Sequence, residues 1–568
     1  MSNMAPTLLN RQLAQLEALR NHFGPNQAAS VVKLLNRLNA ARFPDPASLI
    51  RFHETLLFLR AFPQGPSVLR TAERILNGFH KKIEALRSAG ADMDAFDDFD
   101  TSGIAGTQME DTLTFDVAHW LINRLPGQVD IAWDHYEPGR ELGNTGPRYM
   151  PLLEDDAYVE ADTPWRQWLE TAAGKKSPAS WLVQRFADLR LPAAEKSELY
   201  DSLRVPLRWT LANSTITRTR NWKPVRSVYY HDGPLLSRSQ VSLAAELAKR
   251  PPQLKKLSRE QGQQIMDLIR EVMIVRYREL YGTTLGDPSS VVRTDIGRGL
   301  SIYLWNLPPE RRLPLRAYVA GLTLKNGVPV NYIEAIGLCE WMEVGFNTFY
   351  TFRGGEAGWI YAQVLRSLCH LMGTTCVSVY PYQLGHDNEE AIDSGAFWFY
   401  RKLGFRPGRA DLQSLAEKEQ ARIAADPKYR TPARTLRRLA SGHAFYELPG
   451  SEPKAWDTFS TRNIGLQVNR LMAREFSADA SRMRAQCKRA LEQSLGVTTS
   501  SWTPLEKRAF ENFALVLAQQ PALRGWAKEE KDDLVQIIRA KSKPNEMLYL
   551  HRMQQHDRLR SALLALGS

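Results

Sequence analysis

Apolar side chains recur at helical spacing through both ends of the chain. Within residues 1–90 they stand three or four positions apart in successive stretches, which glycine-proline and phenylalanine-proline pairs interrupt. The same spacing returns from residue 451 to residue 568, where prolines again mark the breaks. We therefore expect mostly α-helical regions at both ends of the chain.

The middle of the chain changes to the pattern of strands. Residues 315–324 form an apolar run rich in β-branched and aromatic side chains, and residues 328–337 begin a second such run. Between them stands Asn326-Gly327, the dipeptide most typical of a two-residue hairpin turn. This pattern predicts an antiparallel β-hairpin.

Further elements follow the hairpin in a regular order. A strand-like run at 341–352 leads into a glycine-rich turn, a helical pattern at 359–372 and another strand-like run at 375–382. A short helix then carries Phe397 and Tyr400 at helical spacing on one face. The order predicts an α+β domain, which we place at residues 283–450.

The short helix and the strand expected after it resemble the corresponding elements of the GNAT acyltransferase superfamily. The shared motif is A-x-x-F-Y-x-K-L-G-F, formed here by Ala396, Phe399, Tyr400, Lys402, Leu403, Gly404 and Phe405. The order of hairpin, glycine-rich turn, helix and strand is also similar to that family. The resemblance implies a mixed sheet with a V-shaped opening between the strand that ends near Phe352 and the strand at 375–382.

The resemblance also implies that the domain binds acetyl-CoA or another acyl-CoA as substrate. Tyr400 would return a proton to the coenzyme A thiolate, and backbone amides of the glycine-rich turn would hold the pyrophosphate at a helix N-terminus. The residues expected to do so are Arg353, Gly354, Gly355, Ala357 and Gly358.

Two positions depart from the family pattern. Glu356 stands where the family has glycine, and Asp393 stands where many members have asparagine. A carboxylate in a first helical turn suits the helix dipole, but it would repel phosphates if it pointed inward.

Transfer of an acyl group to an amine also needs a base that accepts the ammonium proton. In the strand at 341–352, Glu343 shares a face with Gly345 and Asn347, so it could project toward an acceptor. We take Glu343 as the candidate base, with Glu340 behind it. The alternative is a strand residue that merely faces solvent.

Composition is that of a globular chain of several domains. The 568 residues are 43% hydrophobic and 24% charged, and the four cysteines form no C-x-x-C pair, as is usual in a reducing compartment. Pro251-Pro252 indicates a linker, so we expect a mixed, mostly helical and irregular region at 91–250 and a linker with a lead-in helix at 251–282. No membrane-spanning run, export leader or zinc motif is present, and we expect a cytoplasmic protein without a metal cofactor.

The leading interpretation is an N-acyltransferase that moves an acyl group from coenzyme A to an amine. A second is a binding or scaffolding protein that keeps the fold but does not bind coenzyme A, as Glu356 would favour. A third is an aminoacyl-tRNA-dependent transferase, because a net charge of +12 suits an anionic partner such as nucleic acid. The basic segment that favours it contains Arg218, Arg220, Lys223 and Arg226 and overlaps a possible exposed strand at 222–230.

Overall fold

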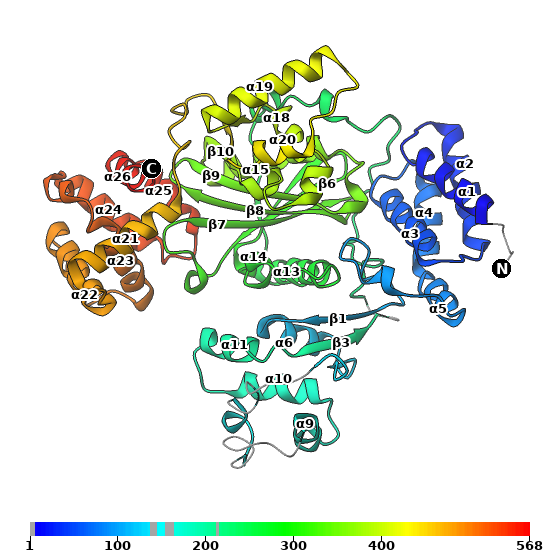
Figure 1. The fold of residues 1–568 in the computed structure, drawn as a ribbon, viewed down its shortest axis with the longest axis horizontal. Coiled ribbons are helices and arrows are strands. Elements are labelled where there is room, and N and C mark those ends of the chain that lie inside the picture. Colours follow the sequence, from blue (N-terminus) through cyan, green and yellow to red (C-terminus); the bar gives the residue numbers. More distant parts are fainter. Residues whose placement is uncertain (1–5, 137–141, 143–144, 154–163, 212–214) are drawn as a thin grey trace. The chain divides into compact units, whose positions relative to one another are not determined.

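In the computed structural model, drawn in Figure 1, the chain forms two compact units. Unit 1 comprises residues 1–234, 264–284 and 326–329, and unit 2 comprises residues 235–263, 285–325 and 330–568. The described residues are 6–136, 142, 145–153, 164–211 and 215–568. Within these ranges, no helix combines the length and the apolar character needed to cross a membrane.

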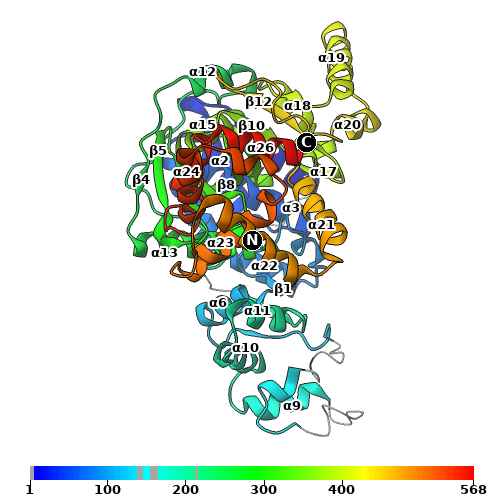
Figure 2. The same ribbon diagram turned by 90° about the vertical axis from the view of Figure 1, so that its left-hand side faces the viewer.

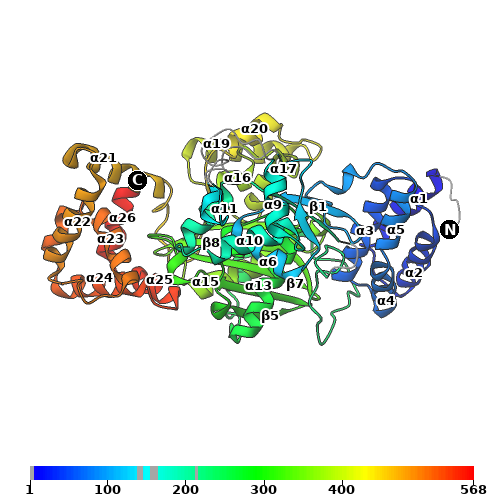
Figure 3. The ribbon, with the colours of Figure 1, turned by 90° about the horizontal axis from the view of Figure 1, so that it is seen from below.

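The first helices of unit 1 lie together, as Figure 3 shows. They are α1 (Pro6–Leu19), α2 (Pro25–Ala40), α3 (Pro46–Ala61), α4 (Pro66–Asn77) and α5 (His80–Ser88). Proline occupies the start of α2, α3 and α4, where its fixed φ suits a helix and its missing N–H has no intrahelical acceptor to lose. The helical spacing in this part of the sequence therefore corresponds to helices.

The rest of unit 1 is built around a small antiparallel sheet with the strand order β1-β3-β2. Its strands are β1 (Gln108–Thr112), β2 (Val129–Ile131) and β3 (Pro206–Thr210). Its helices are α6 (Phe115–Arg124), α9 (Trp165–Ala173), α10 (Pro178–Asp188), α11 (Ala193–Asp201), most of α13 (Arg259–Ile274) and α14 (Tyr281–Thr284). Trp209 on the central strand is buried in the core that α6 and α10 share with the sheet. Figure 2 shows α6 and α10 beside each other.

The possible strand at 222–230 is wrong. No strand forms there, because the backbone finds its partners in a turn instead of a ladder. The N–H of Lys223 donates to the carbonyl of Gly327 at 2.8 Å, and the N–H of Tyr229 donates to the side chain of Asn326 at 2.8 Å. The preceding Arg218 is buried and lies 3.4 Å from the Glu54 carboxylate, so it is not part of an exposed basic surface.

Unit 1 contains a carboxyl group whose acidity should affect stability. Glu279 accepts a hydrogen bond from the N–H of Thr114 at 3.1 Å, and burial raises the pKa of Glu279 from 4.5 to about 7. Because the folded state then holds this proton more tightly than the unfolded chain, the free energy of unfolding should fall as pH rises between these two values.

We expect Glu279→Gln to remove this decrease. Above about pH 7, the variant should be more stable than the parent by about 2–3 kcal/mol, since it keeps an oxygen acceptor and carries no buried charge. Chemical denaturation across pH measures this, with Glu195→Gln on the exposed surface of α11 as the control. Equal slopes for Glu279→Gln and the parent would contradict the assignment.

Unit 2 contains a mixed sheet of nine strands in the order β11-β12-β10-β9-β8-β7-β6-β5-β4. The strands are β4 (Lys255–Lys256), β5 (Val292–Gly297), β6 (Leu300–Asn306), β7 (Ala317–Lys325), β8 (Val328–Leu338), β9 (Trp341–Thr348), β10 (Cys376–Val379), β11 (Arg406–Pro407) and β12 (Ala444–Glu447). β9 and β10 run parallel, and antiparallel pairs flank them on both sides. The prediction of an α+β fold with a mixed sheet is confirmed.

The turn between β7 and β8 has the conformation that its sequence predicts. Asn326 and Gly327 have φ values of 48° and 81°, as a two-residue turn with both central residues left-handed requires. A side chain at position 327 would also collide with the neighbouring backbone, since its Cβ would lie 1.9 Å from the carbonyl oxygen of Lys223. Glycine is therefore required here on two grounds.

Unit 2 has two groups of helices. One group lies around the sheet, and the C-terminal group lies together at one side of it (Figures 1 and 3). Those within the sheet region are α12 (Leu243–Leu247), α15 (Ala357–Met372), α16 (Pro381–Leu384), α17 (Glu389–Asp393), α18 (Ala396–Arg401), α19 (Ala410–Ala425) and α20 (Ala433–Leu439). The C-terminal group is α21 (Thr461–Phe476), α22 (Ala480–Leu495), α23 (Pro504–Leu517), α24 (Lys528–Ala540), α25 (Glu546–Gln554) and α26 (Asp557–Gly567).

Candidate functional site

The parallel pairing of β9 with β10 covers most of the short strand β10 but only the beginning of β9. Trp341 pairs with Cys376, and the last recorded pair joins Glu343 to Ser378. β9 continues to Thr348 without further pairing to β10 in this described part of the sheet. β9 therefore extends beyond its pairing with β10 after Glu343, because β10 ends at Val379.

The two candidate catalytic residues, Glu343 and Tyr400, lie on opposite sides of the sheet. The Phe346 ring contacts Tyr361 of α15 with ring centroids 4.8 Å apart, so Phe346 faces α15 and Glu343 faces away from it. Tyr400 on α18 also contacts Tyr361, at 5.6 Å between ring centroids. Tyr400 thus lies on the α15 side, and Glu343 lies on the opposite face.

Glu343 is a half-buried carboxylate with two basic neighbours. Its Oε2 lies 3.2 Å from Nε2 of His443, and its Oε1 lies 3.9 Å from the Arg316 guanidinium. The ring of Tyr380 meets the His443 ring edge to face at 5.3 Å. Sequence reasoning found Glu343 but missed both neighbours, because they come from distant segments with no shared spacing.

Tyr400 lies in an aromatic cluster and is almost fully buried. Its ring contacts Phe405 at 5.7 Å and Phe399 at 5.2 Å, and burial raises the pKa of Tyr400 well above its ordinary value. The phenol therefore keeps its proton at neutral pH, which is the form that can act as an acid. The buried hydroxyl of the neighbouring Tyr361 has no hydrogen-bond partner among the described residues, and sequence reasoning had not singled it out.

The glycine-rich turn leads from a short 3-10 helix, Tyr350–Phe352, into α15. The N–H groups of Arg353 and Gly355 bond within the turn to Tyr350 and Phe352. The side chain of Arg353 forms an ion pair with Glu390.

The amides at the start of α15 are arranged differently. Ala357 and Gly358 belong to the first turn of the helix, where N–H groups have no intrahelical acceptor. Their N–H groups are therefore able to bind a ligand. The N–H of Gly354 also makes none of the backbone hydrogen bonds of this turn.

Glu356 points inward and is fully buried. Its carboxylate lies 2.9 Å from Nζ of Lys325, pairs with the Arg298 guanidinium, and accepts a hydrogen bond from the N–H of Leu236 at 3.2 Å. Burial disfavours its charge, but Lys325 and Arg298 outweigh burial and hold the pKa of Glu356 below its ordinary value. Burial also disfavours the charge of Lys325 and lowers its pKa to about 8, although the nearby Glu356 carboxylate acts to raise it. One carboxylate therefore meets two cations, and its charge is compensated inside the fold.

Further cations lie near the start of α15. A Cβ atom on Gly358 would be 3.3 Å from Cα of Arg238, so Arg238 lies directly against the first turn. Burial, followed by the charges of Arg238 and Arg430, lowers the pKa of Lys402, so these three cations are close enough to repel one another. Neither Arg238 nor Lys402 has an acidic partner in the part of the chain that the structure describes. The helix start and these side chains together favour an anionic ligand.

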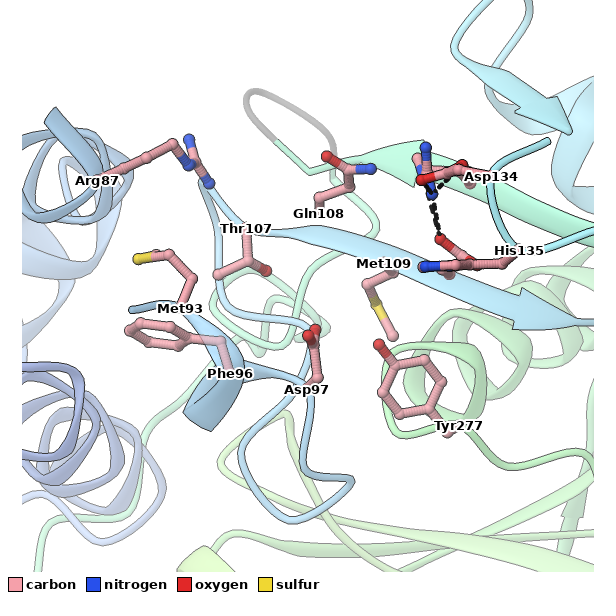
Figure 4. Close-up of a pocket in the computed structure, with 12 residues that line it drawn as sticks. Arg87, Met93, Phe96, Asp97, Thr107, Gln108, Met109, Asp134, His135 and Tyr277 are labelled. Atoms are coloured by element: carbon pink, nitrogen blue, oxygen red, sulfur yellow. Dashed lines mark hydrogen bonds and ion pairs between the residues drawn. The ribbon is translucent and has the colours of Figure 1, made fainter. Parts of the chain in front are cut away.

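Unit 1 has a separate pocket of about 700 Å³ that sequence reasoning missed (Figure 4). Arg208 binds Glu110 at 2.7 Å and Asp134 at 2.7 Å, and Glu110 also lies 2.6 Å from Nδ1 of His135. Burial, followed by the charges of Asp94 and Glu110, raises the pKa of Asp97 on the opposite wall. The charged groups around Arg208 are satisfied by one another, and we assign the pocket no part in the chemistry of unit 2.

Comparison with known proteins adds no relative. No protein-family model, no curated protein and no solved structure matches this chain.

Proposed function

We propose that unit 2 is an acyl-CoA-dependent N-acyltransferase. The observation that carries the proposal is the end of the parallel pairing of β9 with β10 at Glu343, with a cation-rich helix start on the α15 side and a carboxylate on the other face. We propose that a thioester and an amine approach one another here from two faces of one sheet. The resemblance of the motif around Tyr400 to the GNAT superfamily supports the same chemistry.

Each group then has a distinct role. The amides of Ala357 and Gly358, with Arg238 and Lys402 beside them, would bind the pyrophosphate of acyl-CoA. Glu343 would accept the proton that the ammonium of the acceptor must lose before its nitrogen attacks the thioester carbonyl. As the carbon–sulfur bond breaks, Tyr400 would give its proton to the departing thiolate.

His443 extends the path of the proton beyond Glu343. Its Nε2 is 3.2 Å from the carboxylate, and 29% of its side chain is exposed. An imidazole that touches both Glu343 and solvent can carry a proton away after each turnover.

The structure bears on one feature behind each alternative. A scaffold without coenzyme A was favoured by a repelling charge at Glu356, but that charge is compensated by Lys325 and Arg298. Transfer from aminoacyl-tRNA was favoured by the net charge and by the basic segment, of which Arg218 is buried against Glu54 and Arg226 is exposed. We retain the acyltransferase because the cations at the start of α15 and the motif around Tyr400 support it.

Titration of the full chain with acetyl-CoA tests the proposal. The parent should bind, and the double variant Arg238→Ala/Lys402→Ala should bind at least about tenfold more weakly, since each lost cation–phosphate contact contributes on the order of 1 kcal/mol. Lys418→Ala on the exposed surface of α19 is the matched control and should bind as the parent does. Absence of acetyl-CoA binding in the parent would refute the proposed function.

A further inference from the structure

Besides the pocket of unit 1, a hollow in unit 2 lies near Glu343, the candidate base. It has a volume of about 340 Å³ and is lined by the segment before β7 and by the helices α21 and α23. Half of its lining residues are leucine, isoleucine or valine, namely Leu313, Leu315, Ile464, Val468, Leu515 and Val516. An apolar hollow of this size suits the side chain of a small ligand.

One face of α21 forms a wall of this hollow. Thr461, Ile464, Gly465 and Val468 follow one another at helical spacing, and all of them line it. A Cβ atom at Gly465 would meet no atom within 4 Å. The missing side chain thus leaves space that a larger residue at this position would fill.

Arg316 connects the hollow with Glu343. It lines the hollow, and its guanidinium lies 3.9 Å from the Glu343 carboxylate. Its backbone is fixed because its carbonyl accepts a hydrogen bond from Nζ of Lys541 at 2.8 Å. Apart from the ion pair with Glu343, the guanidinium makes no recorded bond to other described residues, so its N–H groups can bind a ligand carboxylate side-on.

We propose that the acceptor amine is that of a free α-amino acid with an aliphatic side chain. Its ammonium would lie at Glu343, its carboxylate at Arg316, and its side chain in the hollow. The 3.9 Å between the two charged groups suits a ligand that carries its amine and its carboxylate on one carbon atom. An alkylamine would bring no carboxylate to Arg316, and an acidic side chain would be desolvated among the leucines.

This inference rests on the proposed acyltransferase function. In the step it implies, the amino nitrogen forms a bond to the acyl carbon while the carbon–sulfur bond breaks. One proton goes from the ammonium to Glu343, and the thiolate takes another from Tyr400. The products are an N-acyl amino acid and coenzyme A.

The test compares leucine with 3-methylbutylamine, which lacks the carboxylate, and with 4-methylpentanoate, which lacks the amine. Calorimetry measures the binding of each to the full chain, and release of the coenzyme A thiol from acetyl-CoA measures transfer. Leucine should bind at least about tenfold more tightly than either analogue, because only leucine can engage both charged groups. Leucine should also give the faster thiol release.

Two variants test the named contacts. Arg316→Gln should weaken leucine binding about tenfold or more and leave 3-methylbutylamine binding equal or stronger, because the lost cation attracts only the carboxylate. Gly465→Leu should abolish leucine binding, because the new side chain fills the hollow, and this variant should still bind acetyl-CoA. Arg462→Gln, exposed on α21 outside the hollow, is the control for the charge change.

The outcomes separate the two levels of the argument. If acetyl-CoA binds and 3-methylbutylamine is acylated as well as leucine, the amino-acid inference is wrong and the acyltransferase stands. If leucine binds but neither leucine nor 3-methylbutylamine releases the thiol, both the acceptor role and the proposed function are refuted. If the parent and Arg316→Gln prefer leucine equally, the role of Arg316 is refuted.

Discussion

Tyr400→Phe should lower the turnover of acyl transfer by about 10²–10⁴-fold while the affinity for acetyl-CoA stays nearly unchanged, because only proton donation to the thiolate is lost. The ring occupies a cluster with Tyr361, Phe399 and Phe405, so a phenylalanine fills the same volume. Burial keeps the phenol protonated, as this role requires. Single-turnover thiol release and a parallel binding titration measure the two effects.

Tyr361→Phe is the matched control for this experiment. Its hydroxyl is buried in the same cluster and has no hydrogen-bond partner among the described residues, so its removal leaves no polar group unsatisfied. We expect turnover within about threefold of the parent, since no proton transfer depends on it. Equal turnover of Tyr400→Phe and the parent would exclude Tyr400 as the acid.

Lys325→Met should lower the free energy of unfolding of unit 2 by about 3 kcal/mol, at the lower end of what breaking a buried ion pair costs. Lys325 and Glu356 are both fully buried, and the ammonium also donates to the carbonyl of Arg298 at 2.6 Å. Without the lysine, the carboxylate keeps, among the described residues, the partly exposed Arg298 and the N–H of Leu236. Denaturant unfolding measures the loss.

A second substitution at position 356 isolates the cause. Adding Glu356→Leu to Lys325→Met removes the uncompensated charge, so the double variant should regain about 1–2 kcal/mol. An unchanged stability in Lys325→Met would mean that the pair contributes nothing. If the double variant were less stable than Lys325→Met, loss of packing and not buried charge would be the cause.

Local patterns in the sequence were sufficient for the core elements of unit 2. Asn326-Gly327 predicts its turn because few other dipeptides adopt two left-handed residues in succession. Phe397 and Tyr400 share the buried face of α18, as their spacing predicts, and Gly404 has a positive φ after the helix. In each of these features, the residues that determine the conformation are close neighbours in the chain.

The environment of the site depends on residues that are distant in the chain. Glu356 looked like a charge facing phosphates because its partners, Lys325 and Arg298, come from the end of β7 and from a turn before β6. His443 and Arg316 meet Glu343 from segments about 100 residues after it and some 30 before it, and no motif joins them. Only the tertiary fold brings these charges together.

Hydrogen–deuterium exchange of the full chain, with and without acetyl-CoA, tests the central claim most directly. If the acyl-CoA site lies where the pairing of β9 with β10 ends, acetyl-CoA should slow exchange at residues 353–360 and at β10 in unit 2. Exchange in unit 1 should not change. The unpartnered amides at the start of α15 exchange readily until a ligand accepts their hydrogen bonds, so their protection should be the largest. Protection confined to unit 1, or no protection anywhere at saturating acetyl-CoA, would contradict the account.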